Sequence, residues 1–199
     1  MERNRRGSWT PIVSALLLLG LLAAAVGIPE GLKRYRLEKE RSASQALWML
    51  TKAEGEFRMN DRDGNGVQDF WTTDVASLYA LGLIPRELAE ADAAPLHPLV
   101  PQPIPYHGYY FRALQQDDSE TPPAAYRQVT DKKSGAVHNL ERFGFIAYPA
   151  EGFTAGKFFR IVNENNTVFH SLTGNPVPTA WPSDNQIRVS WSKIEGVPW

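Results

Sequence analysis

An uncharged, strongly apolar stretch near the N-terminus limits the possible folds of this chain more than any other feature. The basic segment Met1 to Arg6 is followed by a run from Gly7 to Pro29 that contains no charged residue. About twenty apolar residues in a helix, rising about 1.5 Å each, match the hydrocarbon thickness of a membrane. The run predicts a membrane-spanning helix over residues 8–29, behind a basic leader of residues 1–7. The run Ala23 to Ala25 leaves open the alternative of a cleaved secretory signal.

The charges that flank this run do not orient it by themselves. Five basic residues follow the run and outnumber the three arginines before it: Lys33, Arg34, Arg36, Lys39 and Arg41. Long C-terminal domains, however, cross membranes largely regardless of charge. We therefore expect a single-pass protein of the bacterial inner (cytoplasmic) membrane, in contact with membrane lipid, whose C-terminal domain lies outside the cytoplasm.

The residues after Pro29 suffice for one folded domain with its own core. We expect residues 30–58 to continue the N-terminal helix and residues 59–199 to form a globular α+β domain. The formal net charge is −1 and no basic stripe is visible, which argues against nucleic acid as a partner. The chain has no cysteine, which excludes disulfides and thiolate chemistry.

Helical periodicity continues beyond Pro29. Apolar residues recur at spacings of three and four along one face: Ala43, Ala46, Leu47, Leu50, Ala53 and Phe57. A helix from Pro11 to Phe57 would be about 70 Å long, which exceeds the membrane thickness, so its second half must pack on protein. We expect that half to lie across the domain's own antiparallel sheet. A seam with a partner helix is the alternative.

The segment from Gly7 to Phe57 resembles the N-terminal part of type IV pilins and type II secretion pseudopilins. The basic leader ends at Gly7, and Pro29 is the twenty-second residue after it, which is the spacing of those proteins. The resemblance implies a pilin-like fold, an extracytoplasmic domain and other pilin-like subunits as partners. The chain departs from the pattern at Ile12, where the family carries a glutamate used in subunit registration, and this puts cleavage and assembly in doubt.

The sharpest chemistry in the sequence lies in NDRDGNGVQDF, from Asn60 to Phe70. Calcium loops place oxygen ligands at alternating positions, with a glycine at the sharp bend. The candidate ligands are the side chains of four residues and one main-chain carbonyl: Asp61, Asp63, Asn65, Asp69 and the carbonyl of Val67. Thr72 occupies the twelfth position, where an EF-hand has glutamate, and Asp74 is the nearest acidic substitute. A solvated turn that caps the long helix is the competing interpretation.

The remainder predicts short helices and then an antiparallel sheet. We expect helices from about Thr73 to Ala80 and from Pro85 to Ala91. The strand candidates are aromatic and β-branched: Tyr109 to Leu114, Ala125 to Thr130, Phe143 to Tyr148, Phe158 to Asn163 and Thr167 to Leu172. Three runs, PYHGYYFRAL, FGFIAYPA and GKFFRIVNENNTVFH, are similar to an exported bacterial family, domain-of-unknown-function family 2950. That resemblance implies an exported domain and no particular reaction.

No catalytic constellation is recognisable. The four histidines lack metal-binding spacing, and neither a phosphate loop nor a nucleophile elbow is present. His107 is the best single candidate for catalysis or recognition, although such a residue more often hydrogen-bonds in a loop. Two hypotheses therefore stand: a pseudopilin-like protein with a structural or assembly role at the cell envelope, or a tethered calcium- or ligand-binding exported domain.

Overall fold

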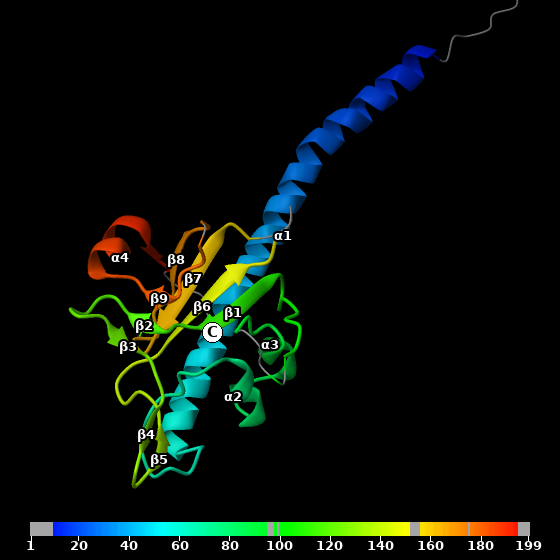
Figure 1. Ribbon diagram of the computed structural model, residues 1–199. Coiled ribbons are helices and arrows are strands. Elements are labelled where there is room, and N and C mark those ends of the chain that lie inside the picture. Colours follow the sequence, from blue (N-terminus) through cyan, green and yellow to red (C-terminus); the bar gives the residue numbers. More distant parts are fainter. Residues whose placement is uncertain (1–9, 95–97, 99, 152–155, 175, 195–199) are drawn as a thin grey trace, which may run out of the picture.

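The longest element of the structure is one continuous helix at the N-terminus. A computed structural model describes residues 10–94, 98, 100–151, 156–174 and 176–194, with side chains from residue 28 onward. Helix α1 (Thr10–Asn60) contains Pro29 without interruption, which agrees with the predicted length. Its N-terminal half projects away from the rest of the protein, and its C-terminal half lies across a sheet (Figure 1).

The predicted membrane span falls almost entirely on residues outside those whose side chains the structure describes. Among the described residues, no helix combines the length and the apolar character needed to cross a membrane.

A five-stranded antiparallel sheet forms the centre of the domain, as expected for the predicted α+β class. Its strands occur in the order β1-β6-β7-β8-β10. Their bounds are β1 (Tyr109–Ala113), β6 (Gly144–Pro149), β7 (Phe158–Asn163), β8 (Phe169–Leu172) and β10 (Ser192–Lys193). Every neighbouring pair is antiparallel, and Asn163 to Asn166 form a turn between β7 and β8.

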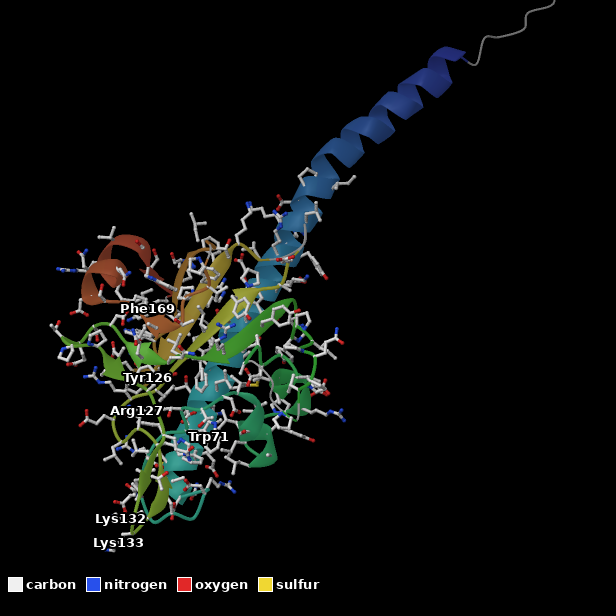
Figure 2. All side chains as sticks on the ribbon, viewed as in Figure 1. Trp71, Tyr126, Arg127, Lys132, Lys133 and Phe169 are labelled. Carbon is white, nitrogen blue, oxygen red and sulfur yellow. The ribbon has the colours of Figure 1, made fainter. Side chains whose placement is uncertain are left out.

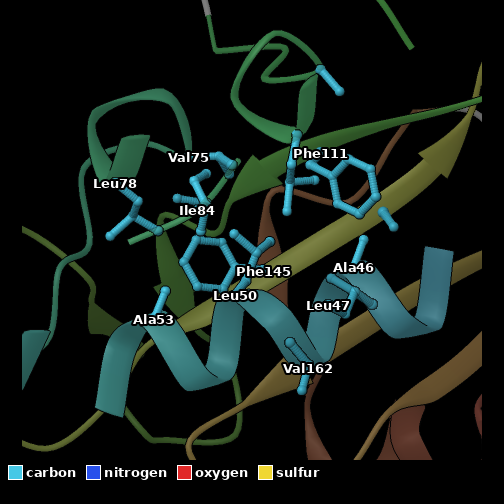
Figure 3. Packing of buried hydrophobic residues seen from close by; sticks show 14 of the residues in the cluster. Ala46, Leu47, Leu50, Ala53, Val75, Leu78, Ile84, Phe111, Phe145 and Val162 are labelled. Carbon is cyan, nitrogen blue, oxygen red and sulfur yellow. The ribbon is translucent and has the colours of Figure 1, made fainter. Parts of the chain in front are cut away.

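The apolar face of α1 packs on this sheet, chiefly on β6 and β7. All six residues of the predicted stripe are buried, and Leu47, Leu50 and Phe57 are fully inaccessible to solvent. Figure 3 shows Leu50 close to Phe145 and Ile84, with Phe111 and Val162 on the same side of the sheet. The prediction that this half of the helix lies on the domain's own sheet is therefore confirmed.

The opposite face of the sheet is covered by small elements that sequence patterns predicted poorly. They are β2 (Gln116–Asp117), β3 (Ala124–Ala125), β9 (Ala180–Trp181) and helix α4 (Asp184–Ser190). The expected strand from Ala125 to Thr130 is wrong: β3 pairs with β2, whereas β4 (Val129–Asp131) pairs with β5 (Gly135–Val137) in a separate hairpin. Helix α4 begins with a capping box formed by Ser183 and Gln186.

Two short helices, α2 (Ala76–Ala80) and α3 (Arg86–Ala89), lie next to α1 and complete the domain. The buried carboxylate of Asp92 accepts hydrogen bonds from the N–H groups of Val75 and Ala76, at 2.8 Å each. It thereby satisfies N–H groups at the start of α2 that the helix itself leaves without a partner.

Candidate functional site

The predicted calcium loop is a tightly folded connection at the C-terminal end of α1. Three of its residues have positive φ: Asp61 at 45°, Gly64 at 68° and Gly66 at 77°. The N–H of Gly66 donates to the Asp61 Oδ2 atom at 3.0 Å, which closes the bend. This left-handed conformation is one that glycine adopts without strain, as the calcium-loop interpretation requires at this position.

The amide group of Asn65 lies at the centre of the loop. Its Nδ2 atom donates to Asp63 Oδ2 at 2.8 Å and to the carbonyl oxygen of Ala136 in β5 at 2.7 Å. Asp69 Oδ2 lies 3.4 Å from the same nitrogen. The Asn65 Oδ1 atom accepts from the N–H of Val67 at 2.7 Å. The structure thus brings Asp63, Asn65 and Asp69 together and adds a carbonyl from a distant strand.

Asp69 is the most deeply buried of the candidate ligands and has no solvent exposure. Its Oδ2 atom accepts from the N–H of His138 at 2.6 Å, while its Oδ1 atom has no hydrogen-bond partner among the described residues. The Oδ1 atom of Asp61 is likewise buried and without a partner in the described chain. Two carboxylate oxygens of the loop are therefore withdrawn from water with no donor to compensate.

The other two positions considered for the loop do not behave alike. Asp74, the nearest acidic substitute, accepts hydrogen bonds from the N–H and the hydroxyl of Ser77 and so caps the start of α2. Thr72 at the twelfth position is buried, and its Oγ1 atom has no partner among the residues described. The Val67 carbonyl accepts from the N–H of Asp69 at 3.2 Å. Across the described chain, no three acidic or histidine side chains form a group able to hold a metal ion.

Burial governs the electrostatics of this region. Partial desolvation raises the pKa of Asp63 although this side chain is exposed; the N–H of Asn65 opposes the effect and the charge of Asp69 reinforces it. Burial lowers the pKa of His138, whose ring lies 4.5 Å from Trp71 and 5.9 Å from Phe57, centroid to centroid. Figure 2 shows Trp71 beside the C-terminal half of α1. His138 is therefore a largely apolar packing residue held against the loop.

Glu54, on the buried face of α1, is a residue that sequence reasoning missed. The side chain has no solvent exposure, and neither carboxylate oxygen has a hydrogen-bond partner within the described residues. Burial raises the pKa of Glu54 well above its ordinary value, the Trp71 backbone N–H opposes this, and the charge of Asp69 adds to it. The spacing of apolar residues along a helix places its polar residues on the exposed face, so it gives no indication that Glu54 is buried.

The described histidines form no catalytic arrangement. His107 is exposed, has φ of 48°, and contacts the Tyr106 ring edge-on. His170 stacks on Phe158 at 4.8 Å, and His97 lies outside the described residues. His107 therefore lacks the acidic or nucleophilic partner that a general base requires.

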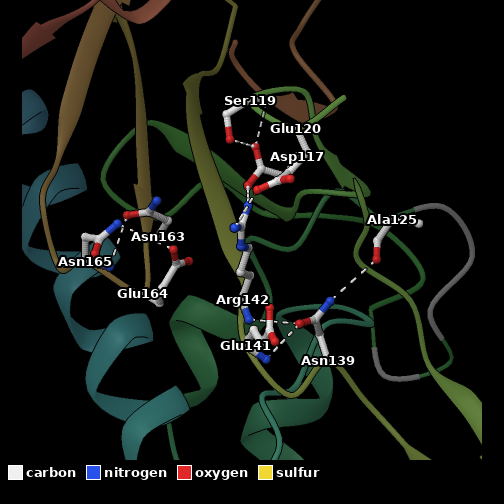
Figure 4. A network of polar contacts seen from close by, with 10 residues as sticks. All are labelled: Asp117, Ser119, Glu120, Ala125, Asn139, Glu141, Arg142, Asn163, Glu164 and Asn165. Atoms are coloured by element: carbon white, nitrogen blue, oxygen red, sulfur yellow. Dashed lines mark hydrogen bonds and ion pairs between the residues drawn. The ribbon is translucent and has the colours of Figure 1, made fainter. Parts of the chain in front are cut away.

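A polar pocket of about 420 Å³ lies at the junction of β2, β9, α4 and the β7–β8 turn. Figure 4 shows Arg142 at its centre, with ion pairs of 2.7 Å to Asp117 and to Glu120. Glu164 lines the same pocket, and burial raises the pKa of its carboxyl group. The sequence offered no signal for this network, because its partners are separated by more than twenty positions.

Comparison with known proteins supports the second resemblance. No curated protein matches the chain, and no solved structure matches it. Residues 23–180 match the family described as "Protein of unknown function (DUF2950)". That match covers the second half of α1, the candidate loop, the four long strands of the main sheet and Ala180 in β9. The chain belongs to the DUF2950 family.

Proposed function

We propose that this protein is a membrane-anchored exported subunit with a structural or assembly role at the cell envelope. In this proposal residues 8–29 cross the inner membrane, and the domain from residue 59 onward lies outside the cytoplasm. The observation that carries it is the division of α1 into a projecting half and a half buried on the sheet. A single helix that serves both as anchor and as core element is the arrangement expected of a pilin-like subunit.

Two exposed apolar side chains of α1, one at the end of the apolar run and one just beyond it, support a partner helix there. Ile28 and Tyr35 are 62% and 48% exposed, and their spacing of seven residues places them on one helical face. Large apolar side chains clustered on an exposed helix face mark surfaces for association. Because Ile12 replaces the pilin glutamate, we assign subunit contact to this face in addition to the apolar run.

Cysteine cross-linking in cells tests this proposal, because the chain has no cysteine of its own. Ile28→Cys should yield a disulfide-linked dimer after mild oxidation. Met59→Cys is the matched control, since Met59 is a 70% exposed apolar residue at the opposite end of α1. The control should stay monomeric.

The intact mass of the protein from the same preparation shows whether the leader, Met1 to Gly7, has been cleaved. A mature N-terminus at Ser8 supports a pseudopilin-like subunit. Retention of Met1 to Gly7, together with no dimer from Ile28→Cys, would instead make α1 a tether for a ligand-binding domain.

A further inference from the structure

Three oxygen atoms, two from the loop and one from β5, surround the Asn65 side-chain nitrogen. They belong to Asp63, Asp69 and the main chain of Ala136, at 2.8, 3.4 and 2.7 Å. An amide nitrogen has two protons and no formal charge. Two carboxylates and a carbonyl are thus held together by one neutral donor group.

The same place contains polar atoms that lack partners. Asp69 is completely buried with its Oδ1 atom unpaired, and the buried Asp61 Oδ1 atom is also unpaired among the described residues. A buried carboxylate oxygen without a donor is costly, and a cation bound beside it would offset that cost. This observation is independent of the loop's spacing and turn geometry.

We propose that the loop binds a calcium ion, and that the carbonyl of Ala136 in β5 supplies a ligand from outside the loop. Rotation of the Asn65 side chain turns its oxygen toward the other oxygen ligands, and it breaks the hydrogen bonds that Asn65 makes with Asp63, Ala136 and Val67 in the ion-free protein. Six oxygen ligands then surround the ion, from Asp61, Asp63, Asn65, Val67, Asp69 and Ala136. Among the described residues the acidic side chains alone form no metal-holding group, so the proposed site depends also on the oxygens of Asn65, Val67 and Ala136.

Calcium suits this donor set better than magnesium. Calcium accepts six to eight oxygen ligands in irregular geometry, including main-chain carbonyls. Magnesium demands a near-ideal octahedron and keeps several of its waters. A loop that supplies side chains and carbonyls from two separate segments fits the larger, less demanding cation.

Ligation by Ala136 would connect the bound ion to the β4–β5 hairpin and so affect the hairpin's mobility. The β4–β5 hairpin pairs only with itself, and Lys132 and Lys133 lie at its tip (Figure 2). Its described links to the loop region are the Asn65 amide, the Asp69–His138 hydrogen bond and the Phe70–Asn139 bridge. A bound ion replaces the neutral hydrogen bond between Asn65 and Ala136 by ligation of the Ala136 carbonyl to a divalent cation, so calcium should immobilise the hairpin.

Calorimetric titration of the full chain in detergent, stripped with EGTA and then given calcium chloride, tests the site. The wild-type protein should release or absorb heat and melt at a higher temperature with calcium. Asp63→Asn removes one ligand charge at an exposed position and should weaken binding by about tenfold or more. Asp118→Asn, which removes the same charge far from the loop, should bind as wild type does.

A second variant, Asn65→Asp, should change the calcium response in the direction opposite to Asp63→Asn. It deletes the donor that holds the oxygens together and adds a ligand charge, so the calcium-free protein should melt lower and the calcium-induced rise should be larger than in wild type. Absence of heat and of any melting shift in wild type would overturn the site. A calcium response unchanged in Asp63→Asn would also overturn it.

Amide hydrogen exchange tests the role of Ala136. Calcium should slow exchange in residues 129–138 of wild type and leave that segment of Asp63→Asn unchanged. Slower exchange confined to residues 61–69 would refute the link to the hairpin while leaving a loop site in place.

Discussion

Glu40 and Arg160 form an ion pair that joins α1 to β7 inside the protein. The two side chains are 9% and 6% exposed, their N–O distance is 3.2 Å, and Glu40 also accepts from the N–H of Lys157. Removing one partner of a buried pair leaves the other charge uncompensated, which costs about 3–5 kcal/mol. Glu40→Gln should therefore lower the free energy of unfolding by about that amount in urea denaturation.

Two further variants separate charge pairing from packing. Glu40→Gln combined with Arg160→Met removes both charges and should recover most of the loss. Glu38→Gln, at an exposed position on the same helix, should change stability little. A double variant as unstable as Glu40→Gln alone would show that the pair does not act through charge.

The raised pKa of Glu54 predicts that the stability of the fold depends on pH. Its raised pKa means that the folded state binds a proton that the unfolded state releases, between the ordinary pKa and the raised one. This contribution is fully present below the ordinary glutamate pKa and is lost as pH rises through the raised pKa. Glu54→Gln should thus become progressively more stable than wild type with rising pH, by up to about 1.4 kcal/mol per pH unit.

Chemical denaturation across a pH series in EGTA measures this difference. Glu38→Gln serves again as the exposed control and should show no pH-dependent change relative to wild type. A constant difference between wild type and Glu54→Gln at every pH would mean that Glu54 titrates alike in both states.

At the level of elements, α1 is where sequence and structure agree best. Its stripe is a local signal, because residues three and four apart share a face whatever the rest of the fold does. Leu50→Ala should cost about 2–5 kcal/mol, since the side chain is fully buried against the sheet. Met59→Ala, on the same helix and exposed, should cost far less. Equal melting temperatures for the two variants would contradict the packing of α1 on the sheet.

The strands show why the remaining elements were harder to predict. The strands β1, β6 and β7 combine aromatic and β-branched residues, and their positions were predicted within a residue or two. The segment from Ala125 to Thr130 has a similar composition, yet its two ends pair with different partners. Both partners are near in sequence, and strand propensity does not encode which neighbouring segment a strand pairs with. At Asp74 the sequence allowed two roles, because capping of α2 and calcium binding favour the same residue type, and the structure shows hydrogen bonds of the capping kind.

For the molecule as a whole, the proposed function requires one helix to be both membrane anchor and domain core. Arginine at Leu18, in the middle of the apolar run, should cost about 2.5–3.5 kcal/mol of insertion free energy. The folded domain should be unaffected by Leu18→Arg, because the buried stripe begins at Ala43. Loss of membrane association with retention of the domain's melting transition is therefore the expected phenotype.

Carbonate extraction of membranes from cells that express the full chain tests whether α1 anchors the protein in the membrane. We expect the wild-type protein to stay in the membrane pellet at high pH, and Leu18→Arg to shift protein to the soluble fraction. Recovery of the wild-type protein in the carbonate supernatant would contradict the anchor, and α1 would then be a stalk that crosses no membrane.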